Sequence, residues 1–240
     1  MELTVGKADL QKELQLCQGV VEKRSTIPIL SNVLLNAADG RLQIAATDLD
    51  VTILSSCAAR VTTPGGVTIE AKRLFDVVRS MPDEDVHMTL QENNSMLIES
   101  GTAKFRLLGL PAEDYPTLPT VSNVDGYDIS LDELKTMVGK VKFAITHEET
   151  RFQLNGALLK LQPNKMEMVA TDGHRLAFAS LRLDAELPRQ EVIVPRKTVL
   201  ELSKLLADSD EEVAIECSVG DTIEEGDTVA ILESMKMEMP

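Results

Sequence analysis

Two pairs of basic side chains with a spacing of seven residues are the strongest sign of chemistry in this sequence. Lys72 is paired in this way with Arg79, and Lys197 with Lys204. Both segments have the apolar spacing of helices, and at 3.6 residues per turn a spacing of seven places each pair on one helix face. A face of this kind can contact the phosphates of a nucleic acid.

The same basic residues have a second interpretation, as part of an ordinary solvent-facing helix. Asp76 follows Lys72 by four residues, which is the spacing of an intrahelical ion pair. Glu201 follows Lys197 at the same distance. Both interpretations stay open, but the recurrence of the basic stripe in two segments favours a phosphate-facing surface.

Catalytic and metal-binding arrangements are not expected. His174 stands two residues after Asp172, but no Ser or Cys nucleophile is placed by a motif, so we assign no catalytic residue. The remaining candidates for metal ligands lack ligand spacing; they are His87, His147, Cys17, Cys57 and Cys217. We therefore predict no metal site and, for the main interpretation, no cofactor.

A long-range repeat organises the chain. Residues 30–50 align with 154–174 without a gap at an offset of 124, which places Ala46-Thr47-Asp48 on Ala170-Thr171-Asp172. Residues 67–81 align with 192–206 at an offset of 125. Solenoid repeats are much shorter, so this period predicts two duplicated domains.

Each repeat is predicted to combine antiparallel strands with two helices, an α+β class. Leu10, Leu14, Cys17 and Val21 form one apolar helix stripe, and residues 130–141 form its counterpart. For that second helix, Ser130 and Glu133 predict a capping box. Asp39-Gly40 predicts a hairpin turn, Pro195 is expected in the first turn of a helix, and Gly173 is expected in a left-handed turn.

The domain boundaries expected from these patterns are 1–120 for the first domain and 121–216 for an incomplete second domain. The stretch 110–123 has three prolines and the character of a linker. Residues 217–240 form a separate segment.

Composition limits the classes of function. The 240 residues carry 24 Lys plus Arg against 39 Asp plus Glu, a formal net charge of −15, which argues against nonspecific wrapping of nucleic acid. No apolar run reaches 18 residues and the start lacks a signal-peptide pattern, so we expect a cytoplasmic protein without a membrane partner.

Several segments together resemble the bacterial DNA polymerase III beta subunit, the sliding clamp family. They are RSTIPILSNVLL (24–35), LPAEDYPTLP (110–119), LNGALL (154–159), VATDGHRLA (169–177) and VIVPRK (192–197). The resemblance covers about residues 1–216. It implies a DNA clamp fold with helices inside and sheets outside, and a non-enzymatic processivity factor that encloses duplex DNA.

The resemblance also implies two sets of site residues. For DNA it adds Arg24, Arg73, Arg151, Phe152, Gln153 and Arg196 to the basic stripe of Lys72, Arg79, Lys197 and Lys204. For a short linear peptide carried by the polymerase alpha subunit and the clamp loader it implies Leu154, Thr171, Gly173, His174, Arg175 and Leu176. Relatives often have two tyrosines where this chain has Phe152 and Gln153, so base or sugar stacking is not assigned to Gln153.

The family is grouped with DNA-directed DNA polymerases, a class of nucleotidyltransferases, but we expect neither polymerase nor 3'-5' exonuclease chemistry. A full-length family member has three such domains and forms a head-to-tail homodimer. We expect the third domain to be absent here and the ring to be weak or absent.

The segment 217–240 resembles part of a different family, the biotin carboxyl carrier domain. The stretch VGDTIEEGDTVAILESMKMEMP (219–240) is similar to its first half, with Met235-Lys236-Met237 as the biotinylation tripeptide. An alternative function is therefore a biotin carrier of an acyl-CoA carboxylase through Lys236, with biotin as the cofactor. The competing interpretation is a fused tail without a function of its own.

Overall fold

The computed structural model describes residues 1–21, 27–118, 127–148, 150–151, 154–208, 213–215 and 231–233. The chain divides into two compact units, Met1–Pro119 and Thr120–Pro240, which are treated separately below. The predicted site residues Arg24, Phe152, Gln153 and Lys236 lie outside the described residues.

The first unit contains eight strands and two α-helices in its described part, with short 3-10 turns at Pro28–Ser31, Glu92–Asn94 and Ala112–Asp114. The strands are β1 (Glu2–Val5), β2 (Asn32–Ala38), β3 (Arg41–Thr47), β4 (Thr52–Thr63), β5 (Gly65–Glu70), β6 (Val86–Leu90), β7 (Ser95–Ser100) and β8 (Ala103–Leu110). The helices are α1 (Lys7–Cys17) and α2 (Ala71–Ser80).

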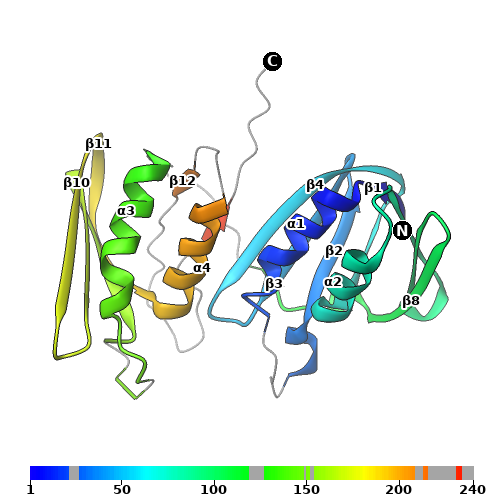
Figure 1. Ribbon diagram of the computed structural model, residues 1–240, viewed down its shortest axis with the longest axis horizontal. Helices are drawn as coiled ribbons and strands as arrows, with labels where there is room; N and C mark the ends of the chain where they lie inside the picture. Colours follow the sequence, from blue (N-terminus) through cyan, green and yellow to red (C-terminus); the bar gives the residue numbers. More distant parts are fainter. Residues whose placement is uncertain are drawn as a thin grey trace. The chain divides into compact units, whose positions relative to one another are not determined.

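All strand pairs of the first unit are antiparallel, and their order is β1-β6-β7-β8-β5-β2-β3-β4. Because β1 also pairs with β4, the sheet closes on itself. Helices α1 and α2 lie side by side against this sheet (Figure 1). They bury Leu10, Leu14, Leu74 and Val78, which confirms the predicted apolar helix faces, except that α1 ends at Cys17 and the predicted stripe residue Val21 lies beyond it.

The second unit has the same two-helix plan. Its described elements are β9 (Tyr127–Ile129), α3 (Leu131–Val141), a 3-10 turn at Lys142–Ala144, β10 (Gly156–Thr171), β11 (Leu176–Pro195), α4 (Arg196–Asp208), β12 (Val213–Ile215) and β13 (Ile231–Glu233). Strand β10 pairs antiparallel with β11, and β9 with β12. The predicted α+β class with antiparallel sheets and two helices per repeat is confirmed.

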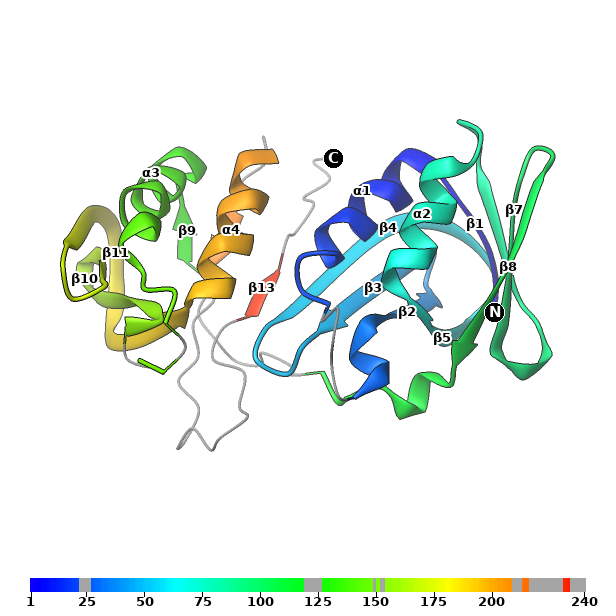
Figure 2. The same ribbon diagram turned by 60° about the horizontal axis from the view of Figure 1, so that its bottom comes forward.

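One apolar core holds the second unit together. Helices α3 and α4 lie beside each other and against the β10–β11 ribbon (Figure 2). Leu134 and Val138 of α3 pack in the same cluster as Val199 and Leu206 of α4. Since alternate residues of a strand face opposite sides, Met166, Met168 and Ala170 of β10 reach this cluster while the residues between them face outward.

A positive φ recurs at matching positions of the two units. Asp39 and Gly40 have φ of 48° and 74° between β2 and β3, as the predicted two-residue turn requires. At an offset of 124, Asn164 has a φ of 60° where the register of β10 shifts around Pro163. The repeat in the sequence is therefore a repeat in backbone conformation.

A second turn is duplicated in greater detail. Asp48 accepts hydrogen bonds from the backbone N–H groups two and three residues later, and so does Asp172. Thr47 and Thr171 each accept one from the residue two positions later, through their hydroxyl oxygens. Those two residues have positive φ, 80° at Leu49 and 89° at Gly173, which confirms the left-handed turn predicted for Gly173.

Two predicted details of helix starts are corrected. Ser130 is the N-cap of α3, but its side chain makes no capping bond, so the capping box is not formed. Helix α4 begins at Arg196, and Pro195 is the last residue of β11. Pro195 therefore stands one residue before the helix.

Part of the expected linker is anchored to the first unit. Tyr115 is buried, and its hydroxyl accepts a hydrogen bond from the Thr47 N–H (3.1 Å) and donates one to the Asn32 carbonyl (3.2 Å). Burial raises the pKa of the Tyr115 hydroxyl from 10.0 to about 12, against the opposing effect of the Thr47 hydrogen bond. This phenol joins the segment after β8 to β2 and β3.

We expect Tyr115→Phe to destabilise the first unit by about 1–3 kcal/mol, because it leaves a buried N–H and a buried carbonyl without their partner. Native-state hydrogen exchange of the β2 and β3 amides measures this loss for the first unit alone. A raised pKa means that the contribution of Tyr115 is complete below pH 10 and is lost as the pH rises towards 12. Tyr115→Phe should lack this alkaline loss; unchanged exchange at neutral pH would contradict the anchoring role.

Candidate DNA- and peptide-binding surfaces

The basic face of α2 is exposed, as the helix pattern predicts. Ala71, Leu74 and Val78 are buried against the sheet. Lys72, Arg73 and Arg79 are therefore directed to solvent, and all three are exposed. The guanidinium of Arg79 also lies over the Phe75 ring, 5.5 Å from its centroid.

The ion pairs on this helix differ from the expected ones. Asp76 pairs with Arg79 at 3.0 Å and not with Lys72. Lys72 forms no ion pair with any residue that the structure describes. A spacing of three brings Asp76 beside Arg79 as readily as a spacing of four would bring it beside Lys72, so the expected Lys72–Asp76 pair is wrong.

Helix α4 carries the matching basic residues, but some of them are less exposed to solvent than those of α2. Lys204 is exposed and pairs with Glu201 at 2.6 Å, which repeats the Arg79–Asp76 arrangement at an offset of 125. Arg196 and Lys197 are half-buried at the start of the helix. Nearby, the Lys142 ammonium donates to the Ser203 hydroxyl at 2.7 Å and joins the turn after α3 to α4.

Arg151 lies between the two predicted sites of the second unit. Its Nε pairs with Glu148 at 2.9 Å. A Cβ added at Gly173 would lie 3.5 Å from the Arg151 Nη1, so this guanidinium lies against the turn that contains Gly173. The structure thus brings a predicted DNA-binding residue next to a predicted peptide-binding turn.

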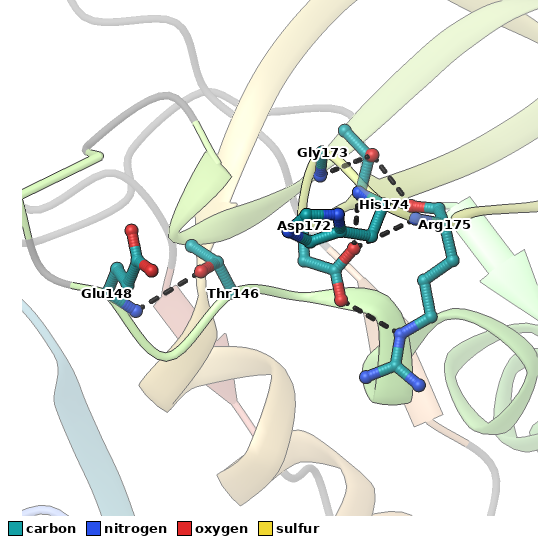
Figure 3. A network of polar contacts seen from close by, with 7 residues as sticks. Thr146, Glu148, Asp172, Gly173, His174 and Arg175 are labelled. Carbon is teal, nitrogen blue, oxygen red and sulfur yellow. Dashed lines mark hydrogen bonds and ion pairs between the residues drawn. The ribbon is translucent and has the colours of Figure 1, made fainter.

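The turn between β10 and β11 is held by a compact polar network (Figure 3). Asp172 Oδ1 accepts from the N–H groups of His174 (3.0 Å) and Arg175 (2.9 Å), and its Oδ2 accepts from the Arg175 Nε at 2.9 Å. The Thr171 hydroxyl donates to the Arg175 carbonyl at 2.7 Å. With the Gly173 N–H that donates to the Thr171 hydroxyl, these bonds fix the backbone from Thr171 to Arg175.

The same network explains the electrostatics of Asp172. Backbone hydrogen bonds from His174 and then Arg175 are the main causes that lower the pKa of its carboxyl from 3.8 to about 2. A lowered pKa means that the stabilisation is present above the ordinary value and is lost as the pH falls through about 2. The turn therefore keeps its carboxylate acceptor throughout the neutral and mildly acidic range.

An apolar surface adjoins this turn. Leu176 is 67% exposed, and Phe178, two residues further on the same face of β11, is 54% exposed. Phe143 is 58% exposed, and the Arg175 guanidinium lies 5.8 Å from its ring centroid. Leu154, the remaining predicted peptide-binding residue, is half-buried, and its N–H donates to the Arg151 carbonyl at 2.9 Å.

Sequence reasoning missed Phe143 and Phe178. The signal for Phe178 was the alternation of β11, in which Ala177 and Ala179 are buried and the residues between them face outward. Phe143 gave no such signal, because it lies in a 3-10 turn directly after α3.

Other chemistry is limited in the described parts of the chain. Cys17 is fully buried, and burial raises the pKa of its thiol to about 12, so it is not a nucleophile. No group of three or more His, Cys, Asp and Glu residues within the described ranges could hold a metal ion. Among the same residues, no helix is long and apolar enough to cross a membrane.

Two family models match the chain in succession. The DNA polymerase III beta subunit N-terminal domain matches residues 1–119, and the central domain of the same subunit matches residues 128–236. The second match extends over most of the segment 217–240. The resemblance of that segment to a biotinyl domain stays a prediction.

Individual relatives agree with these matches. The chain is 38% identical over 219 residues to the beta sliding clamp of Pseudomonas aeruginosa, covering 90% of this chain and 59% of the relative. It is 39% identical over 231 residues to that of Caulobacter vibrioides, covering 91% of this chain and 60% of the relative. The chain therefore spans about three-fifths of the length of the relatives it matches.

Solved structures show the same fold. The crystal structure of the DNA polymerase sliding clamp from Bacillus subtilis superposes with a TM-score of 0.87 at 31% identity, covering 91% of this chain and 60% of that one. The duplicated units, the two helices in each and the consecutive domain matches lead to one assignment. The chain belongs to the DNA polymerase III beta subunit family, the beta sliding clamps.

Proposed function

We propose that this chain is a sliding-clamp subunit that contributes to enclosing duplex DNA and tethers the replicative polymerase during DNA replication. In this role it is a processivity factor in the cytoplasm and has no catalytic activity of its own. The observation that carries the proposal is the recurrence of an exposed basic helix face in both units, at Lys72 and Arg79 of α2 and at Lys204 of α4.

The charge distribution suits movement along DNA. The formal net charge is −15, so the chain as a whole repels a polyanion. Cations gathered on helices supply sequence-independent phosphate contacts, and contacts of this kind carry no base information. A protein held mainly by enclosure needs only weak contacts to the duplex.

The peptide-binding turn supports the tethering role. Its backbone is fixed by Asp172 before any partner arrives, and fixing a binding surface in advance lowers the entropy cost of binding. The exposed side chains of Leu176 and Phe178 present apolar area beside it. We propose that it binds short linear peptides of the polymerase alpha subunit and the clamp loader.

Removal of the helix cations should weaken binding to a labelled DNA duplex and flatten its salt dependence. In fluorescence anisotropy, the triple variant Lys72→Ala, Arg79→Ala and Lys204→Ala should reduce the slope of log K against log salt by up to about 0.9 for each phosphate-binding cation that it removes. A triple variant of strand cations, Lys104→Ala, Lys160→Ala and Lys165→Ala, changes the net charge equally and serves as the control. Equal effects from both sets would contradict a basic helix surface that binds DNA.

Loss of apolar area at the turn should weaken peptide binding. We expect Leu176→Ala to reduce the affinity for a synthetic peptide from the clamp-binding segment of the alpha subunit by about tenfold, as truncation of a central interface anchor does. Isothermal titration calorimetry measures this change. Leu108→Ala removes another highly exposed leucine, from the first unit, and should leave the affinity unchanged; a loss there of the same size would refute the assignment.

The biotin-carrier alternative rests on the similarity of residues 219–240 to the first half of a biotinyl domain, with Met235-Lys236-Met237 as the biotinylation tripeptide. If Lys236 accepts biotin, coexpression with a biotin ligase should give a streptavidin signal that Lys236→Ala abolishes. Lys204→Ala is the matched control and should retain the signal. An absent signal, or one that survives Lys236→Ala, would exclude this function.

A further inference from the structure

Several exposed cations of the proposed DNA surface, though not Lys72, share a local arrangement. In four cases a carboxylate three residues earlier in the chain forms an ion pair with the cation. The pairs are Glu70–Arg73 at 2.7 Å, Asp76–Arg79 at 3.0 Å, Glu148–Arg151 at 2.9 Å and Glu201–Lys204 at 2.6 Å.

Two of these pairs repeat each other. Asp76 matches Glu201 and Arg79 matches Lys204 at the 125-residue offset, and each pair lies on the second helix of its unit. Neither residue type is the same in the two copies, since Asp and Arg in one are Glu and Lys in the other. In both copies, nevertheless, a negatively charged residue stands three positions before a positively charged one.

The pairs are formed at the surface, where they stabilise a fold little. All four cations are at least half exposed, and three of the four carboxylate side chains are 40% to 60% exposed, whereas that of Glu201 is 17% exposed. Solvent-exposed pairs at helical spacing contribute only a few tenths of a kcal/mol. Stability alone therefore gives little reason for the carboxylates beside these four cations.

The consequence for DNA is larger, because a phosphate must compete with the carboxylate for the same cation. A cation whose charge is locally neutralised by a carboxylate also attracts the phosphates of a distant duplex more weakly. We propose that the paired carboxylates, Asp76 and Glu201 above all, restrain DNA affinity so that the subunit can move along the duplex. This inference rests on the proposed DNA-binding function and adds a role for acidic residues within it.

The test is the double variant Asp76→Asn with Glu201→Gln in the full 240-residue chain. Both changes preserve side-chain shape and remove only the negative charge. We expect its affinity for a labelled duplex at low salt to rise about three- to tenfold, as expected for the release of two surface ion pairs. The slope of log K against log salt should also steepen, because each of the two cations then binds phosphate without competition from a carboxylate.

The matched control is Asp39→Asn with Asp184→Asn. It makes the same change in net charge, one substitution in each unit, at exposed positions away from the helices. It should raise the affinity much less and leave the salt slope unchanged. An equal rise in both variants would show that net charge alone acts, and would overturn the proposal.

Two further outcomes distinguish the restraint from a purely structural role and from a failure of DNA binding. A lower melting temperature of Asp76→Asn with Glu201→Gln without tighter DNA binding would show a structural role only, and would overturn the restraint while leaving the DNA-binding function intact. If the unaltered chain and every variant fail to bind duplex at low salt, the proposed function itself fails.

Discussion

The need of each helix to bury one apolar face against its sheet is the constraint on which the rest of this structure depends. Leu74 and Val78 satisfy it in α2, and Val199 and Leu206 in α4. Once these faces are buried, the polar side of each helix must face solvent. The cations therefore reach solvent as a consequence of core packing, in both copies of the repeat.

The turn between β10 and β11 depends on a different constraint, the supply of acceptors for backbone N–H groups at a strand end. Asp172 satisfies two of them and also pairs with Arg175. The same arrangement at Asp48 shows that it belongs to the repeated fold unit and is not particular to the second copy. What distinguishes the second unit is the apolar surface beside the turn, at Leu176, Phe178 and Phe143.

Much of this architecture could be predicted from the sequence, because the long-range repeat and the helix stripes are carried by many residues at once. The Asp39-Gly40 turn and the positive φ of Gly173 were predictable because few residue types accept those conformations. The ion-pair partner of Asp76 was not predictable. Ion pairs at spacings of three and four residues are nearly equal in energy, and side-chain rotamers decide between them. The missing cap bond of Ser130 is a similar case.

The candidate site residues divide in the same way, into those that a sequence motif predicts and those that depend on tertiary packing. Thr171 to Leu176 could be assigned through their family motif, whereas Phe143 depends on how a 3-10 turn places it near Arg175. The anchoring of Tyr115 required two strands and a connecting segment to meet, which no local pattern records. Local periodicity thus predicts which face of a helix or strand is buried, whereas tertiary packing decides which side chains become partners.

The most direct test of a DNA-facing helix surface is site-specific photo-crosslinking of the chain to a duplex. Crosslinking residues at positions 72 and 204, on α2 and α4, would be compared with ones at positions 108 and 178, on β8 and β11. The account predicts crosslinks to DNA from the two helix positions and none from the two strand positions. Crosslinks mainly from positions 108 and 178 would contradict it.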